Sequence, residues 1–130
     1  MINVDRSLWP VIVIRFEGDV TLGEHANLYD ELDELIAMET PCGIVIDHEA
    51  QDGWTEHSSH LFRAWIERNA ENVQRYCAGG AAKVSNPFTR KAAQPVLARM
   101  VPFPIKLVKS LDDGVIWVAR QIEMATQAVG

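Results

Sequence analysis

The side chains with the most capacity for chemistry lie together in the segment His57-Ser58-Ser59-His60. Thr55, just before them, is typical of a helix N-cap, so we expect this segment to open a helix. The backbone N–H groups of a helix start favour an anion, and a phosphorylated Ser58 would have to emerge there. The alternative interpretation is that the Ser58 hydroxyl satisfies a free backbone N–H of that helix.

Histidine and acidic residues around this segment raise the question of a metal ion. His48 and Glu49 precede it and, with His57 and His60, provide side chains of the types that bind zinc. No established zinc signature fits their spacing. We therefore expect polar residues at the rim of a sheet, with no metal and no cofactor.

A catalytic role was weighed for His25, Asp47 and Asp52. His25 lies on an apolar helix stripe, and we interpret it as a hydrogen-bonded histidine at the core edge because no partner nucleophile is identifiable. Asp47 and Asp52 are carboxylates at strand ends, which are too common to indicate an acid–base pair. A small hydrolase using His25 or His57 is therefore the least supported function, and we expect no catalytic residue.

Strands must position these side chains. Runs of β-branched and apolar residues predict strands over 11–16, 43–47, roughly 75–84 and 105–108, and a further short apolar segment precedes Trp9-Pro10. Thr21 and Glu24 form the pattern of a capping box that opens the first helix. The apolar face of this helix consists of His25, Leu28, Tyr29, Leu32, Leu35 and Ile36.

Three more helices follow in the sequence. The second begins at Thr55, the third at Asn86-Pro87, where a proline is tolerated in the first turn, and the last at Ser110. We expect Pro95 to kink or break the third helix. The resulting order, β-β-α-β-α-β-α-β-α, predicts one domain over residues 1–130 with an α/β fold: a single mostly parallel sheet of about five strands and four helices.

Five successive tiny side chains, at positions 78–82, are an unusual feature of the strand predicted over 75–84. Glycine inside a strand often marks the close approach of another element or of a ligand. One interpretation is that Trp65, Phe62 or Phe88 fills the space. The other is a pocket for an apolar ligand, which is lined by Trp54, Trp65, Gly79, Gly80, Phe88 and Arg90.

Charge is divided unevenly along the chain, whose formal net charge is −6. Residues 1–60 carry two basic and 13 acidic side chains, whereas residues 61–130 carry ten basic and five acidic ones. The pI of 5.1 is far below the value above about 9 that is typical of nucleic-acid-binding domains. We expect no nucleic acid partner. We interpret the charged segments as solvated faces or as complementary contacts in a homodimer. Trp54 and Trp117 are either part of a surface for a protein partner or a second copy, or rim residues that cover the sheet edge.

The start of the chain and its two cysteines indicate the cellular compartment of the protein. The start lacks the basic and long apolar regions of a signal peptide, and the longest early uncharged run, over 7–14, is too short to span a bilayer. Cys42 and Cys77 belong to no Cys-x-x-Cys motif and are interpreted as buried, reduced thiols. We therefore expect a cytoplasmic protein with no integral membrane segment.

The order of elements resembles the STAS fold of anti-sigma-factor antagonists, and more closely the SpoIIAA-like branch that is often grouped with lipid-binding CRAL-TRIO domains. The similar pieces are Gly18-Asp19 before an acidic helix, the strand end at Ile46-Asp47, residues 79–84, Arg90 in the next helix, and residues 111–118. The last piece is similar to the Ala-x-x-Trp-Leu pattern at the end of such domains. The resemblance covers nearly the whole chain and implies its fold more strongly than its function.

In antagonists of that type, the first serine of an Asp-Ser-Ser-Gly segment is phosphorylated by a partner kinase. Ser58 and Ser59 match the two serines, while His57 and His60 replace the other two residues. The resemblance thus implies a phosphorylation switch or partner-binding segment at Thr55, His57, Ser58 and Ser59. The leading functional hypothesis is a non-enzymatic regulatory or protein-interaction module, and the alternative is a carrier of a small apolar, lipid-like ligand.

Overall fold

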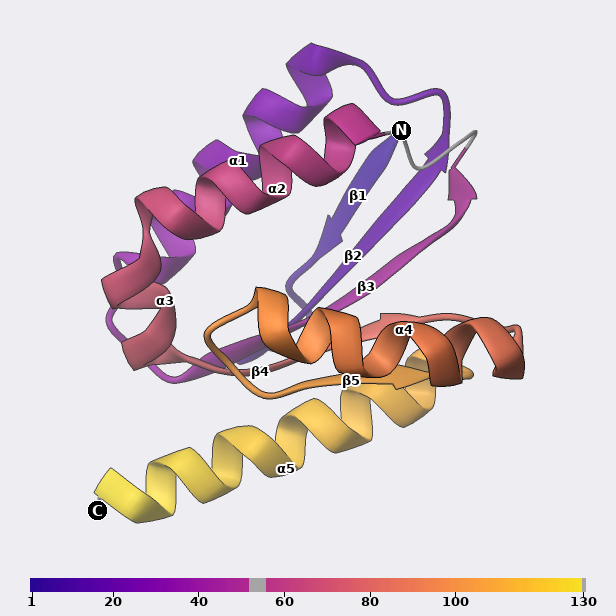
Figure 1. Cartoon of the computed structure of the whole chain (residues 1–130). Helices are drawn as coiled ribbons and strands as arrows, with labels where there is room; N and C mark the ends of the chain where they lie inside the picture. The colour runs from indigo at the N-terminus through magenta and orange to yellow at the C-terminus, as the bar shows by residue number, and fades with distance from the viewer. Residues whose placement is uncertain (52–55, 130) are drawn as a thin grey trace.

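A computed structural model describes residues 1–51 and 56–129 of the chain. It contains one sheet of five strands in the order β1-β2-β3-β4-β5 (Figure 1). The strands are β1 (Ile2–Asp5), β2 (Val11–Gly18), β3 (Cys42–Gln51), β4 (Cys77–Lys83) and β5 (Ile105–Val108). β1 is antiparallel to β2, and the other neighbouring pairs are parallel. The mostly parallel α/β sheet predicted from the sequence is therefore confirmed.

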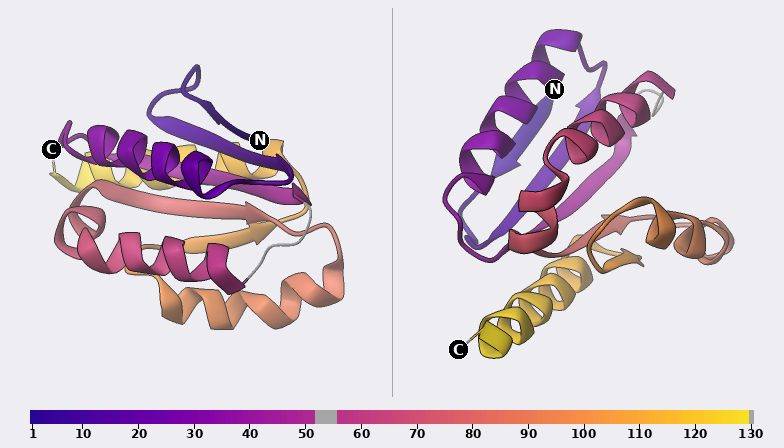
Figure 2. Two further views of the ribbon diagram at one scale, coloured as in Figure 1. Left: turned by 90° about the horizontal axis from the view of Figure 1, so that it is seen from above. Right: turned by 60° about the vertical axis from the view of Figure 1, so that its left-hand side comes forward.

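Helices cover both faces of the sheet. They are α1 (Leu22–Ile36), α2 (Glu56–Arg68), α3 (Ala70–Tyr76), α4 (Pro87–Met100) and α5 (Leu111–Val129). Figures 1 and 2 show α5 by itself across the sheet from α1 and α2. Because helices pack on both faces, the parallel strands are buried on both sides, and their sequences read as nearly continuous apolar runs.

Alternate residues of each strand contribute to two separate cores. On one face, Ile12 and Ile14 pack with buried residues of α1, α2 and α3. On the other face, Val11 and Val13 pack with Val118 of α5 and its buried neighbours. The last helix thus contributes Val118 and Ile122 to the second core, and Leu111, Val115, Trp117 and Ala119 pack against it.

Helix α1 follows its sequence pattern closely. The Thr21 hydroxyl accepts from the backbone N–H of Glu24 at 3.2 Å, and the Glu24 carboxylate accepts from the backbone N–H of Thr21 at 2.9 Å. This is the predicted capping box. The buried residues of the helix are the six predicted ones, His25, Leu28, Tyr29, Leu32, Leu35 and Ile36.

Two details differ from the sequence-based prediction. The strand predicted over 75–84 begins at Cys77, because the short helix α3 extends to Tyr76 and the Cys77 N–H still bonds the carbonyl of Val73. Helix α3 is therefore one helix more than the four that the sequence predicts. It follows α2 after a single residue, so the sequence has no turn signal between the two helices. Pro95 does not break α4, which is one helix over Pro87–Met100.

The tiny residues of β4 allow close packing on both faces of the sheet. A Cβ atom at Gly80 would lie 2.7 Å from the ring of Phe103, and one at Gly79 would lie 3.1 Å from the side chain of Gln121 in α5. Both distances are too short for a carbon contact. The prediction that Trp65, Phe62 or Phe88 fills the space at these glycines is therefore wrong: the neighbours are Phe103 on one face and α5 on the other.

Candidate functional site

The start of α2 lies against α1 through a buried polar pair. The Ser58 hydroxyl oxygen is 3.2 Å from Nε2 of His25, and both side chains are 3% exposed. The His25 ring also stacks on Tyr29, with 6.3 Å between ring centroids. His25 is therefore a hydrogen-bonded histidine inside the core, and Ser58 contacts this ring across the interface between the two helices.

Ser59, the next residue, faces a different environment. It is half-buried and lines a cavity of about 620 Å³ that lies between α2 and α4. His60 follows it on the exposed side of α2. Thr55, Trp54 and Asp52 lie outside the described residues, as does the side chain of His57. The serine pair thus divides its two hydroxyl groups between the core and the cavity.

Two helix stripes form the walls of this cavity, which we name the apolar cavity. On α2 the lining residues are Ser59, Phe62, Arg63 and Ile66, and on α4 they are Thr89, Ala93, Leu97 and Met100. Each set recurs at intervals of three or four residues, the spacing that places side chains on one helix face. No residue of α4 is buried, so this helix stands away from α2 and leaves the space between them open.

The floor of the apolar cavity is the sheet. The floor residues alternate along two strands, Ile44 and Ile46 in β3 and Gly80 and Ala82 in β4. Ile105 of β5 lies at the same surface. Phe103 and Val101 close the end near the start of β5, and His48, Gln51 and Asn86 lie at the end where the strands of the sheet finish. Its volume is within the range of about 300–1,000 Å³ that small-molecule sites have, with mostly apolar walls and a few polar groups.

Only one described member of the predicted pocket lines this cavity, and it is Gly80. Gly79 faces α5, and Phe88 is 84% exposed. Trp65 is buried among core residues and donates from Nε1 to the Asp33 carboxylate at 2.8 Å. The predicted grouping of Trp65, Gly79, Phe88 and Arg90 in one pocket is therefore corrected, because these residues lie on different faces and elements.

Arg90 has a defined place near the start of α4. Its Nη1 donates to the carbonyl oxygens of Val84 at 2.8 Å and Ser85 at 3.3 Å. It therefore fixes the loop between β4 and α4. The residues that form the α4 wall of the cavity were not among those predicted, although positions 89, 93, 97 and 100 recur at three- and four-residue intervals and this spacing was the available signal.

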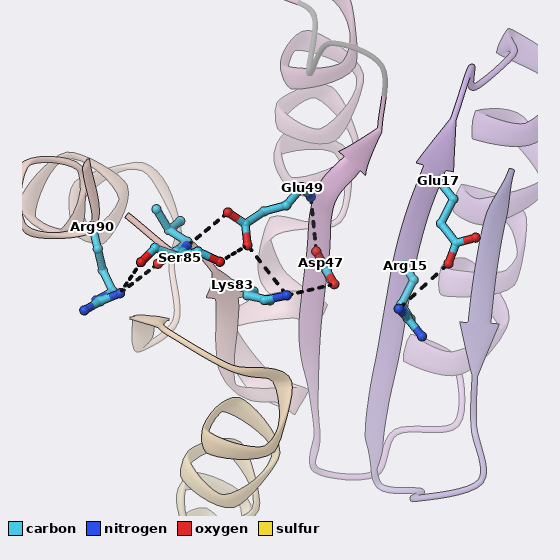
Figure 3. A network of polar contacts seen from close by, with 8 residues as sticks. Arg15, Glu17, Asp47, Glu49, Lys83, Ser85 and Arg90 are labelled. Atoms are coloured by element: carbon cyan, nitrogen blue, oxygen red, sulfur yellow. Dashed lines mark hydrogen bonds and ion pairs between the residues drawn. The ribbon is translucent and has the colours of Figure 1, made fainter. Parts of the chain in front are cut away.

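A polar network crosses the ends of β3 and β4 (Figure 3). Lys83 Nζ lies 3.8 Å from the Asp47 carboxylate and 3.7 Å from that of Glu49. Glu49 also accepts from the hydroxyl and backbone N–H of Ser85, at 2.6 and 3.0 Å. The two hydrogen bonds from Ser85 are the main reason why the pKa of Glu49 lies below its usual range, and the nearby Lys83 charge lowers it further.

Of the polar residues predicted at the rim of the sheet, Glu49 belongs to this network. Asp47 is 6% exposed, and its carboxylate accepts from the backbone N–H of Glu49 at 3.1 Å. A buried carboxylate that is bonded in this way and paired with a lysine stabilises the ends of two strands. We assign Asp47, Glu49 and Lys83 a structural role in holding the loop that leads to α4.

Within residues 1–51 and 56–129, no three His, Cys, Asp or Glu side chains are grouped as a metal ion would require. None of the helices described there has the length and apolar character needed to cross a lipid bilayer.

Comparisons with known proteins identify the fold. No protein-family model matches the chain, and no curated protein matches it in sequence. Among solved structures, it is similar to an uncharacterised protein of the DUF3478 family with a SpoIIAA-like fold from Shewanella loihica PV-4, with a TM-score of 0.66 and 17% identity over 91% of this chain and 92% of the other. It is also similar to an anti-sigma factor antagonist from Mycobacterium paratuberculosis, with a TM-score of 0.56 and 21% identity over 92% and 93% of the two chains. The chain therefore has the SpoIIAA-like fold that its sequence resembles.

Proposed function

We propose that this chain of SpoIIAA-like fold is a non-enzymatic regulatory module that acts in the cytoplasm by binding a protein partner. The observation that carries the proposal is the structural correspondence with an anti-sigma factor antagonist along 92% of the chain. The name of that protein describes a role in opposing another protein. Fold similarity alone does not determine function, so the proposal also needs a surface on this chain.

The surface that we assign to the partner is the outer side of α2 near its start. His60 and Arg63 are exposed there, and Arg63 and the half-buried Ser59 also border the apolar cavity. This extends the partner-binding segment predicted at Thr55, His57, Ser58 and Ser59. It lies where the parallel strands end, the edge at which sheets of this class commonly bind ligands.

A regulatory phosphate would fit Ser59 better than Ser58. A phosphate adds a charge of about −1.5 to −2, and at Ser58 this charge would enter a site that is 3% exposed. Burying such a charge would force α1 and α2 apart. Ser59, by contrast, is half-buried on the cavity wall, where a phosphate would reach solvent with less change of packing.

Affinity isolation from the native cell tests the partner surface. The wild-type bait is compared with a His60→Glu, Arg63→Glu variant and with a Met124→Glu control, since Met124 is 60% exposed at the far end of α5. We expect at least one protein to be enriched by the wild type and the control and lost from the α2 variant. If every recovered protein is retained by the α2 variant, this surface is not the binding site.

We also propose that the chain forms a homodimer. The support is the charge division of the sequence, in which the acidic first half and the basic second half of two copies are complementary. Native mass spectrometry at micromolar concentration should show a dimer whose fraction decreases as salt is added. A monomer at all salt concentrations would contradict this part of the proposal.

A second candidate function, binding of a small apolar ligand, is favoured by the apolar cavity. A neutral fluorescent probe, N-phenyl-1-naphthylamine, should bind the wild type with an increase of emission. Ala93→Phe would fill the cavity, because Ala93 lines it, whereas Ala92→Phe on the exposed side of the same helix is the matched control. Loss of probe binding in the first variant alone supports ligand binding, and equal binding by both variants contradicts it.

A further inference from the structure

A second hollow lies on the other side of the sheet edge, away from the apolar cavity. It has a volume of about 320 Å³ and is bounded by β5, the start of α4 and one side of α5. Four cationic side chains line it, together with one carboxylate and one indole ring. We name it the basic groove and define it by Arg90, Lys106, Lys109, Asp113, Trp117 and Arg120.

The cations of the basic groove come from three different parts of the chain. Arg90 lies in α4, Lys106 in β5 and Arg120 in α5, and Lys109 follows β5 directly. Within α5, the groove residues 113, 116, 117 and 120 recur at three- and four-residue intervals, so they form one stripe. This stripe lies beside the core stripe of α5, which contains Val118 and Ile122, and Trp117 also packs against that core. The fold therefore gathers charge that is dispersed in the sequence.

No described carboxylate neutralises these cations. Across residues 1–51 and 56–129, the ion pairs involve Arg6, Arg15, Lys83 and the amino terminus, and none involves a cation of the basic groove. Asp113 is the one acidic residue in the described lining, so four positive charges face one negative charge. Such a concentration of like charge is unfavourable in the free protein and is relieved when an anion binds.

Arg90 is held in place for such a role. Both of its described bonds, to the carbonyls of Val84 and Ser85, come from Nη1. A guanidinium has five N–H donors in a rigid planar group, so those on Nη2 and Nε have no described partner. Because the position of the group is already fixed, less conformational freedom is lost when it binds an anion.

Trp117 provides an apolar wall. Its ring packs over β4, and a Cβ atom at Gly79 would be 3.4 Å from it. The absence of a side chain at Gly79 therefore lets the indole lie against the strand. The ring is half-buried rather than covered and borders the basic groove. A flat indole next to several cations suits a ligand that has both an aromatic ring and negative charge.

We propose that the basic groove binds a small organic phosphate in which a phosphate group is joined to an aromatic ring. The phosphate pairs with Arg90, Lys106 and Arg120, and the ring packs on Trp117. This inference is independent of the partner surface on α2 and of the apolar cavity, because it uses none of their residues. It also gives a role to the excess of basic residues in the second half of the chain.

Two probes with the same phosphate group distinguish the contribution of the negative charge to binding from that of the aromatic ring. Phenyl phosphate and methyl phosphate carry the same phosphate, and only the first has an aromatic ring. Isothermal titration calorimetry at low salt should show that the protein binds phenyl phosphate more tightly than methyl phosphate. Trp117→Leu should remove most of that difference while it leaves methyl phosphate binding unchanged.

Variants of the cations test the location. Lys106→Gln and Arg120→Gln should each weaken phenyl phosphate binding by about tenfold, because each removes a charge-assisted contact. Both residues are exposed, so the fold should persist. Lys91→Gln, an exposed neighbour of Arg90 outside the groove, is the control of equal charge change and should leave the affinity unchanged.

Three outcomes would overturn the proposal. The first is no detectable binding of phenyl phosphate at about 10 mM, which is weaker than any specific site of this charge should be. The second is an equal loss of affinity in Lys91→Gln, which would indicate a general charge effect. The third is a set of amide chemical-shift changes, on adding phenyl phosphate, that excludes β5 and the first turns of α5.

Discussion

The Ser58 hydroxyl lies 3.2 Å from Nε2 of His25, and this contact joins α2 to α1 inside the core. The serine that sequence resemblance connects with a regulatory phosphate is thus a buried structural residue in this chain. Any modification of Ser58 must first separate the two helices. Its neighbour Ser59, on the wall of the apolar cavity, is the accessible hydroxyl of the pair.

Ser58→Ala should lower the free energy of unfolding by about 1–3 kcal/mol, because a buried ring nitrogen of His25 loses a hydrogen-bond partner. Urea denaturation followed by circular dichroism measures the change. In a double-mutant cycle with His25→Leu, the coupling between the two residues should be about 1 kcal/mol. Additive effects of the two core substitutions would disprove the contact.

Gly80→Ala should destabilise the fold by about 1–3 kcal/mol, since the new methyl group would overlap the ring of Phe103. The distance of 2.7 Å between that methyl position and the ring leaves no room without movement of Phe103. Thermal unfolding provides the measurement. Gly23→Ala in the first turn of α1, where the nearest atom would be 3.9 Å away, is the matched control and should not destabilise. Equal effects of both substitutions would contradict the packing at Gly80.

Stability should decrease at alkaline pH because of two thiols on adjacent strands, Cys42, which is buried, and Cys77, which is half-buried. Burial raises the pKa of Cys42 to about 11 and that of Cys77 to about 12, whereas a thiol in the unfolded chain titrates near about 8.5. At pH values between the unfolded and the folded pKa of a thiol, that thiol is deprotonated in the unfolded chain and still protonated in the folded protein. The free energy of unfolding is therefore unaffected below about pH 8.5 and falls as pH rises toward the folded pKa.

Chemical denaturation at pH 7, 9 and 10 measures this loss. Cys42→Ala should have a lower stability at pH 7, because an apolar contact is removed, and a smaller decrease between pH 7 and pH 10 than the wild type. Slow reaction of both thiols with an alkylating reagent in the folded state should accompany the raised pKa values. A pH dependence identical to that of the wild type would show that Cys42 is not the titrating group.

Ser85→Ala should raise the pKa of Glu49 toward its ordinary value, because two hydrogen bonds with Ser85 involve this carboxylate and one of them is lost. A folded-state pKa below the unfolded one contributes stability above the unfolded pKa, and this contribution is lost as pH falls through the folded value. The wild type should therefore be more stable than the variant at pH values above the unfolded pKa of Glu49, and this advantage should disappear as pH falls through the folded value. Titration of the Glu49 side chain by NMR is the direct measurement, and an unchanged pKa in Ser85→Ala would refute the assigned cause.

The sequence was most informative where local chemistry and helix periodicity agree. The capping box at Thr21 and Glu24 and the six-residue apolar stripe of α1 were predictable because they depend on residues within one helix. Helix α3 was missed because a single residue separates it from α2, and the strand predicted from residue 75 overlapped its end. Local patterns do not define where two adjacent helices divide.

The candidate sites depend on contacts between distant segments, and these were less predictable. The burial of Ser58 requires His25, which is 33 residues earlier in the chain. The apolar cavity requires α4 to stand away from α2, and Phe103, distant from β4 in sequence, to cover Gly80. Residue type alone indicated the close approach of another element or of a ligand at positions 79 and 80, but it did not indicate which of the two, or which side chains pack there.

Photo-crosslinking in the native cell tests the central claim, that a protein partner binds the outer side of α2. A photoreactive amino acid is placed at position 60, on this surface, and in a second strain at position 124, which is 60% exposed on α5. The account predicts a covalent adduct with one partner protein from position 60 and none with that protein from position 124. Adducts of equal yield from both positions, or no adduct from position 60, would contradict it.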